Sequence, residues 1–476
     1  MHKLDHRNSY EWMGTFWFPD KSDERFAGKL SYTPEQGISV FILNISKKRF
    51  GNKQKIIMHG VVRHDNESVP ITLLETFFQT VGVNISTISS EGVKGSARAL
   101  VFGEVLDKFN VSGLYIDYDD NFYQFFLQNK MISNIAKFAD NPIVVNKANI
   151  LLTIANATAQ TVYSTDDLDD VLCVFARNSK RVMQDFKERV KPFLEQNKYR
   201  LLKRTETNIG VYIKDGYKKI SKYRTFERIW RLYIEVLLDC QIDVNFCWVR
   251  IGKKRKEKIS YRLCAMLGDD FRPNKVSVNK KLHHLFMPIN LRAFSADNDL
   301  GTLNTSVVNW FNVYYKPGWN NIIQGIKEIV HREHPLIEQK DFVMLISYIE
   351  TLQNLQGVPK NSDVDRFVIE NLSSIWIKKI KLLLGYKVTQ DKNLGNCLCE
   401  IRNAIVHPKS QNKNNGKYYK IANNEVKLQN IYGILAGAFI KVFIKEMYNI
   451  PDDTVEKYMD SFIKARSSYK YIKYNK

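Results

Sequence analysis

Residues 26–45 have the sequence FAGKLSYTPEQGISVFILNI, and their apolar side chains alternate with polar ones on both sides of Glu35-Gln36-Gly37. Alternation at period two is typical of a β-strand that buries one face. Phe26–Tyr32 and Ile38–Ile45 are therefore predicted to be two strands. The residues between them include a glycine and fit the turn of a hairpin.

The same alternation extends from residue 14 to about residue 165. Further strands are predicted at Lys55–Val62, Val69–Leu74, Ala99–Val105 and Val111–Tyr118. Asp119-Asp120-Asn121 supplies another turn. Many short strands separated by turn residues predict a β-rich domain over residues 1–165, of the sandwich type.

Residues 166–302 form a basic segment of mixed character, which we expect to continue the N-terminal region. Apolar side chains have helical spacing in Phe226–Leu238, and Arg177–Leu194 has the pattern of a helix with a basic face. Val244–Ile251 and Ile259–Met266 are predicted to be strands. The loop between them is strongly basic and contains Lys253, Lys254, Arg255 and Lys256.

From about residue 303 the apolar spacing changes to that of helices. Phe342–Ile349 carries one apolar stripe and Val364–Ile380 a second. Further helices are predicted at Leu394–His407, Val426–Met447 and Thr454–Ala465, and Lys409–Lys420 is predicted to be a flexible loop. Helices joined by short loops indicate an antiparallel bundle over residues 303–476. The predicted fold class is therefore α+β and multidomain, with a β-rich, sandwich-like part followed by an all-α bundle.

The formal net charge of +21 is unevenly distributed along the 476 residues. Residues 1–170 hold slightly more acidic than basic side chains, so the positive excess lies in the rest of the chain. A basic surface favours a polyanionic partner such as a nucleic acid. Met1–Asp20 lacks the apolar core of a secretory signal, and Ile431–Ile444 is too short for a membrane helix. The six cysteines fit a reducing compartment, so we expect a cytoplasmic protein without a membrane partner.

The segment Arg402-Asn403-Ala404-Ile405-Val406-His407, followed by Pro408, places a cation, an amide and an imidazole near a predicted helix end. Residues four apart share a helix face, so Asn403 and His407 are neighbours. The long side chain of Arg402 can reach the same ligand. Pro408 disfavours a helical conformation at His407 and is expected to end the helix there.

These groups suit the cleavage of an RNA phosphodiester without a metal ion or a cofactor. His407 can move protons near neutral pH, and Arg402 can bind a phosphate. Attack by the RNA 2′-hydroxyl needs both a base and an acid, which one histidine per chain supplies with difficulty. Two chains related by a two-fold axis would bring two copies of the motif into one cleft.

The Arg-Asn-x-x-x-His spacing resembles that of HEPN ribonucleases. The helical region Leu336–Tyr448 carries the motif in its later part, as HEPN domains of the ApeA type do. Gly14-Thr15-Phe16-Trp17-Phe18-Pro19, followed by Gly28-Lys29-Leu30, looks like the start of the N-terminal domain of ApeA-like abortive-infection proteins. The resemblance implies a bacterial anti-phage protein in which a β-rich sensor region restrains a C-terminal endoribonuclease.

The resemblance also implies roles for the motif residues. His407 would be the acid and base, Arg402 would bind the scissile phosphate, and Asn403 would orient Arg402 or the ribose. The active unit would be a homodimer or a larger symmetric homo-oligomer. Its substrate would be single-stranded or loop RNA such as that of a tRNA, giving 2′,3′-cyclic phosphate and 5′-hydroxyl ends. A phage protein would be the trigger sensed by the N-terminal region.

A purely structural interpretation of the motif stays open, in which Arg402 pairs with Glu400 and the Asn403–His407 pair caps the helix. Glu350 on the first bundle helix could instead face Arg402 and orient it. Further candidates for contacts with RNA phosphates are Lys409 and Lys413 after the motif, and Lys253, Lys254, Arg255 and Lys256 in the middle segment.

Two other functions are weighed against the ribonuclease. The chain could be a non-catalytic RNA-binding or dimerisation protein that binds through its basic middle segment. A metal-dependent nuclease is the third candidate, although the chain has no recognisable Asp…Glu-x-Lys core. His331-Arg332-Glu333-His334 is expected not to hold a metal, because no second ligand cluster follows. The aromatic residues Trp310, Phe311, Tyr314, Tyr315 and Trp319 are expected to pack rather than to stack on bases.

Overall fold

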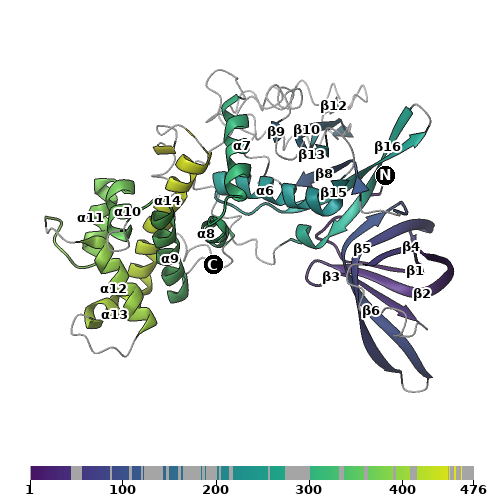
Figure 1. Cartoon of the computed structure of the whole chain (residues 1–476), viewed down its shortest axis with the longest axis horizontal. Coiled ribbons are helices and arrows are strands. Elements are labelled where there is room, and N and C mark those ends of the chain that lie inside the picture. The colour runs from purple at the N-terminus through teal and green to yellow at the C-terminus, as the bar shows by residue number, and fades with distance from the viewer. Residues whose placement is uncertain are drawn as a thin grey trace.

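The computed structural model describes residues 2–43, 56–85, 88–106, 110–119, 122, 143–145, 150–158, 162–163, 184, 188, 201–202, 205–213, 218–255, 258–273, 301–331, 337–358, 363–389, 393–407, 415–448, 450, 455–456 and 463. A β-rich part lies at one end of the molecule and a helical bundle at the other (Figure 1). Three helices lie between them, namely α6 (Ile220–Leu238), α7 (Gly301–Tyr314) and α8 (Asn320–Val330). The predicted α+β class is confirmed.

Six antiparallel strands form a closed barrel in the N-terminal part. They are β1 (Tyr10–Phe18), β2 (Lys21–Thr33), β3 (Gly37–Leu43), β4 (Ile56–His64), β5 (Glu67–Ile85) and β6 (Ile88–Phe102). Their order is β3-β2-β1-β4-β5-β6, and β6 pairs back to β3 from Ile38↔Ala97 to Leu43↔Gly92. The predicted hairpin is present, with Thr33 paired to Gly37 at the turn. The sandwich-like packing predicted from the alternation thus takes the form of one sheet closed on itself.

The barrel interior is organised around the buried ring of Phe16 on β1. Glycines on both neighbouring strands make room for this ring. A Cβ added at Gly28 would lie 3.1 Å from it, and a Cβ added at Gly60 would lie 2.8 Å from it. Phe16 and Gly28 belong to the two separate N-terminal segments that carry the family resemblance, so those segments pack directly on each other. Glycine in a strand interior often marks such a close approach.

The strand β6 belongs to two parts of one twelve-stranded sheet. Its residues Ala99–Phe102 pair with β16, and the sheet continues in the order β16-β15-β8-β13-β10-β9. These strands are β8 (Gly113–Tyr118), β9 (Ile143–Val145), β10 (Ile150–Thr158), β13 (Thr205–Ile213), β15 (Val244–Arg255) and β16 (Lys258–Gly268). Two further short pairs are β7 (Asn110–Val111) with β14 (Lys218–Lys219) and β11 (Val162–Tyr163) with β12 (Leu201–Leu202). The predicted strands of the middle segment are confirmed as the β15–β16 hairpin. Nearly all of the predicted helix Arg177–Leu194 and most of the turn Asp119-Asp120-Asn121 lie outside the described residues.

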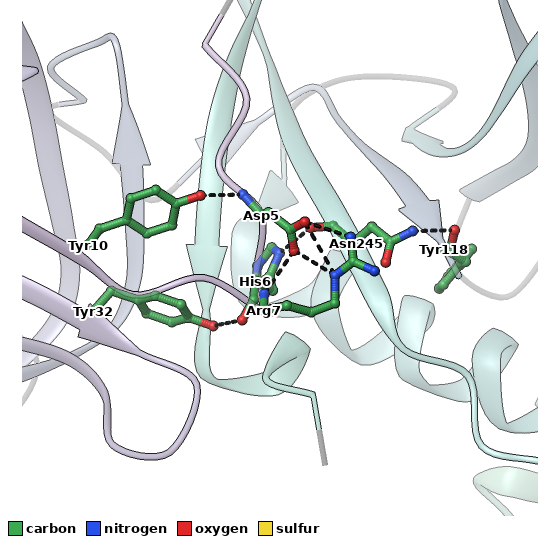
Figure 2. A network of polar contacts seen from close by, with 7 residues as sticks. All are labelled: Asp5, His6, Arg7, Tyr10, Tyr32, Tyr118 and Asn245. Atoms are coloured by element: carbon green, nitrogen blue, oxygen red, sulfur yellow. Dashed lines mark hydrogen bonds and ion pairs between the residues drawn. The ribbon is translucent and has the colours of Figure 1, made fainter. Parts of the chain in front are cut away.

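The segment before β1 joins the barrel to the second half of the sheet (Figure 2). The backbone N–H of His6 donates to the Asn245 carbonyl on β15 at 3.0 Å, and the Tyr32 hydroxyl on β2 donates to the His6 carbonyl at 2.8 Å. The Asn245 amide donates in turn to the Tyr118 carbonyl on β8 at 2.9 Å. Because His6 is fully buried, desolvation lowers the pKa of its imidazole to about 4. A neutral histidine therefore lies at this junction at neutral pH.

The helix α6 is buried on nearly all sides and connects the sheet to the helical bundle. The indole Nε1 of Trp310 on α7 donates to the Ile229 carbonyl on α6 at 2.7 Å. The ring of Tyr233 on α6 lies 4.4 Å from that of Tyr448, and its hydroxyl pairs with that of Ser306 at 2.8 Å. One hydrophobic cluster runs from the sheet through α6 into the bundle. The boundary near residue 303 stays a prediction.

The bundle consists of α9 (Gln339–Leu355), α10 (Asp363–Asn371), α11 (Ser374–Leu383), α12 (Leu394–Val406), α13 (Asn415–Ala422) and α14 (Glu425–Tyr448). Its longest helix, α14, is buried along most of its length. The predictions for α12 and α14 are confirmed to within a few residues, and the predicted apolar stripe Phe342–Ile349 lies within α9. The predicted helix Thr454–Ala465 lies largely outside the described residues. None of the described helices has both the length and the apolar character of a membrane span.

Two predictions for the bundle were wrong. The stripe Val364–Ile380 is not one helix, because Ser373 has the extended conformation (φ −67° and ψ 158°) and is the N-cap residue of α11. The segment Lys409–Lys420 is not a loop throughout, because α13 begins at Asn415. Ile421 and Ala422 at the end of α13 are buried in the bundle, and this packing overrides the polar composition of the segment.

Candidate functional site

The motif helix α12 is anchored at its start. The Asn393 side chain caps it by accepting the Asn396 N–H at 2.8 Å. The Gly395 N–H donates to the Asp365 carboxylate on α10 at 3.1 Å, and a side chain at Gly395 would collide with the Asp365 backbone. Ile401 and Ala404 are on the buried face of α12, whereas Arg402 and Asn403 are half-buried. The motif therefore begins at the edge of the buried face.

Arg402 is held by two side chains. Its Nη1 lies 2.5 Å from Oε1 of Glu350 on α9, and its Nε and Nη2 each lie 3.3 Å from Oδ1 of Asn403. The side chains of Arg402 and Glu350 are 24% and 26% exposed. The guanidinium is therefore oriented by a carboxylate and an amide, and one of its edges stays near solvent. The structure pairs Arg402 with Glu350 rather than with Glu400.

His407 lies immediately after the helix and is exposed. Its backbone N–H donates to the Asn403 carbonyl at 2.8 Å, and its φ of −123° and ψ of 66° end the helical conformation. The residue before it, Val406, is 50% exposed. The predicted helix end is thus present, and it puts the imidazole at the surface within two turns of the oriented guanidinium.

This arrangement can supply two of the components that phosphodiester cleavage needs. The guanidinium presents N–H donors to a phosphate, and the imidazole can exchange a proton with a ribose or leaving-group oxygen. The motif of a single chain has one imidazole, and the side chains of Asn403 and Glu350 are already in contact with Arg402. The catalytic roles of Arg402, Asn403 and His407 and the supporting role of Glu350 stay predictions.

Three of the other predicted RNA contacts lie away from this site. Lys253, Lys254 and Arg255 lie at the tip of the β15–β16 hairpin, where Arg255 pairs with Lys258. This hairpin and α12 are at opposite ends of the molecule (Figure 1). Lys256, Lys409 and Lys413 lie outside the described residues.

A cluster behind α12 was not predicted from the sequence. The hydroxyls of Tyr386 and Tyr418 are 3.0 Å apart, and the Tyr418 hydroxyl donates to Sγ of Cys397 on α12 at 3.5 Å. Burial, together with Cys397 and Tyr386, raises the pKa of Tyr418, so its hydroxyl keeps its proton. The ammonium of Lys417 lies 3.6 Å from the centre of the Tyr386 ring. The cluster fixes α13 against the motif helix, and only the tyrosine in the predicted loop could have signalled it.

Two other sequence signals have structural explanations among the described residues. The imidazole of His331 lies 2.6 Å from the buried carboxylate of Glu235. Trp310, Phe311 and Trp319 are buried, which confirms that they pack in the core. Tyr315 differs, because 56% of it is exposed. His334 lies outside the described residues.

Comparison with known families bears on the N-terminal part of the chain. Residues 11–121, which include the barrel strands, match one family model. That family is the ApeA N-terminal domain 1. The match supports an ApeA-like anti-phage defence protein and agrees with the resemblance of the segments around Phe16 and Gly28. No curated protein and no solved structure matches the chain.

Proposed function

We propose that this chain is a metal-independent endoribonuclease of anti-phage defence, with a HEPN-type active site in its helical bundle. The observation that carries the proposal is the orientation of Arg402 by Glu350 and Asn403 beside the exposed His407. The ApeA-type N-terminal domain supports the defence context. The net charge of +21 supports a polyanionic substrate.

The proposed reaction is transfer of the RNA phosphodiester to its own 2′-hydroxyl. A base removes the 2′-hydroxyl proton, the 2′-oxygen attacks phosphorus, and an acid protonates the departing 5′-oxygen. Arg402 binds the phosphoryl oxygens as their charge increases. The products are a 2′,3′-cyclic phosphate and a 5′-hydroxyl, and DNA is not cut because it lacks the nucleophile.

The proposed active unit is a symmetric homodimer. His407 of one chain acts as the base and the same residue of its partner acts as the acid, so the one shared cleft has two imidazoles. The exposure of His407 and Val406 at the end of α12 supports this arrangement, because a second chain can approach there. The substrate is single-stranded or loop RNA, such as that of a tRNA, because in-line attack needs a flexible linkage. The protein would act in the cytoplasm, and its barrel would sense a phage protein.

The test is cleavage of a labelled RNA in the presence of a chelator by the wild-type protein, Arg402→Ala and His407→Ala. Both variants should lose cleavage while keeping the wild-type unfolding curve. Undiminished cleavage by either variant would refute the proposed site. Salt-sensitive RNA binding without products, weakened most by substitutions at Lys253, Lys254 and Arg255, would instead support the non-catalytic RNA-binding protein.

A further inference from the structure

A cavity of about 480 Å³ opens between the barrel and the first helices of the C-terminal half. It is lined by the β2–β3 turn with Glu35, by α6, by the short 3₁₀ helix η4 (Asp269–Phe271) and by α8. This volume lies in the range of sites that hold a small molecule. The cavity is far along the chain from Arg402 and His407, and the proposed ribonuclease does not use it.

Two helices turn charged faces toward this cavity. Arg228, Arg231 and Glu235 line it from α6, and their spacing places them on one helix face. Lys327 and His331 line it from α8 and its end, four residues apart. Since both faces lie against the same space, their side chains can contact one ligand.

The acidic side chains of α6 and η4 already have partners. Glu235 is 2% exposed, accepts the Ile242 N–H at 3.0 Å and pairs with His331. Asp270 forms an ion pair with Arg224. Asp269 lies 3.6 Å from Nε of Arg272. These carboxylates are therefore largely compensated before a ligand enters.

Arg231 is also committed. Its Nε lies 3.2 Å from the buried Glu227 carboxylate, and its Nη2 donates to the Asp270 carbonyl at 3.0 Å. These contacts fix the wall of the cavity, because one joins Arg231 to Glu227 on the same helix and the other joins it to η4. A ligand would meet a preformed polar surface there, which reduces the ordering that binding requires.

Two cations of the lining have no carboxylate partner among the described residues. Arg228 is exposed, and the ammonium of Lys327 lies 5.8 Å from the centre of the Tyr314 ring. Two such cations in one cavity suit a phosphate group. Across the cavity, the exposed Glu35 offers a carboxylate that would repel a second anionic group but accept a hydrogen bond from an amino group.

We propose that this cavity binds a nucleotide, with its phosphates at Arg228 and Lys327 and the amino group of its base toward Glu35. The ligand would touch the barrel turn and α8 together. Arg272, directly after η4, already contacts the barrel turn, because its Nη1 donates to the Glu35 carbonyl at 3.1 Å. A bound nucleotide should therefore strengthen the contact between the barrel and the helical half and raise the thermal unfolding temperature.

Calorimetric titration of the full chain with ATP, GTP, CTP and UTP tests this directly, with pyrophosphate as the comparison. At least one nucleotide should bind, and pyrophosphate should bind more weakly because it lacks the base. Arg228→Glu and Lys327→Glu should each lower the affinity for that nucleotide about tenfold or more, since each substitution removes a charge-assisted contact and adds a repulsion. Glu35→Gln should lower the affinity for the nucleotide but leave the affinity for pyrophosphate unchanged.

Lys222→Glu on the exposed side of α6 is the matched control, because it makes the same charge change on the same helix outside the cavity. The nucleotide affinity of Lys222→Glu should stay within about twofold of the wild-type value. Four results would overturn the proposal: no nucleotide binding to the wild-type chain, equal affinity for pyrophosphate, an equal loss in Lys222→Glu, or a loss of binding in Arg402→Ala. The last result would place the nucleotide at the proposed active site, so the two proposals can fail separately.

Discussion

Replacing Glu350 by glutamine should lower RNA cleavage while leaving the fold intact. Glutamine has nearly the same shape but no charge, so it removes the ion pair with Nη1 of Arg402 and keeps a hydrogen-bond acceptor. The guanidinium would then be held only by uncharged side chains, including Asn403, whose Oδ1 lies 3.3 Å from Nε and Nη2 of Arg402. The guanidinium would become less well oriented toward a bound phosphate.

The size of the effect follows from the burial of the pair. The two side chains are 24% and 26% exposed, so the pair is neither a solvated surface contact nor a deeply buried one. A hydrogen bond to a charged group contributes about 1.5–3 kcal/mol, and because glutamine keeps an acceptor we expect a loss of about 1–2 kcal/mol. That loss corresponds to about a 5- to 30-fold slower single-turnover cleavage. The free energy of unfolding should fall by only about 1 kcal/mol.

Glu370→Gln is the matched control. It makes the same substitution in the Arg366–Glu370 ion pair on α10, whose side chains are 51% and 50% exposed. It should change both cleavage and stability very little. Cleavage by Glu350→Gln at a rate within twofold of Glu370→Gln would refute the idea that this carboxylate orients Arg402.

Three further substitutions test other parts of the account. Arg402→Lys keeps the charge but cannot contact Glu350 and Asn403 through one planar group, so cleavage should fall about tenfold or more in the same assay. Lowering the pH should destabilise the wild-type protein relative to His6→Gln. Burial lowers the pKa of His6 from 6.5 to about 4. The contribution of neutral His6 to the free energy of unfolding is therefore complete above pH 6.5 and is lost as the pH falls to 4. The difference should reach about 3 kcal/mol in urea unfolding, and equal pH dependence of the two proteins would contradict it. Gly28→Ala should lower the free energy of unfolding by about 1–3 kcal/mol, because the new Cβ would lie 2.5 Å from the Phe41 carbonyl oxygen and 3.1 Å from the Phe16 ring. Gly416→Ala, with open space around it, should not destabilise the protein.

The strand and helix patterns predicted most of the elements because local periodicity determines which face of each element is buried. The hairpin around Gly37 and the α12 helix are examples of this. Closure of the barrel could not be predicted in the same way. Closure depends on β6 pairing with β3 between Ala97 and Gly92, and continuation of the sheet depends on β6 pairing with β16 from Ala99 to Phe102. Both pairings join residues far apart in the chain. The helix at Asn415 was missed because the burial of Ile421 and Ala422 outweighs local composition there.

The candidate site shows the same division. The motif Arg402–His407 could be found from spacing alone, and the helix end at His407 follows from Pro408. The sequence could not decide between Glu350 and Glu400 as the partner of Arg402, because the choice depends on how α9 packs against α12. The cavity beside α6 also has no local signature, since its charged residues come from separate segments between Glu35 and His331.

The most direct test of the account is the chemistry of the RNA ends produced in chelator. Attack by the 2′-hydroxyl predicts 2′,3′-cyclic phosphate and 5′-hydroxyl ends from the wild-type protein, and no cleavage by His407→Ala. Ends with a 3′-hydroxyl and a 5′-phosphate, or the same cyclic ends from His407→Ala, would contradict it.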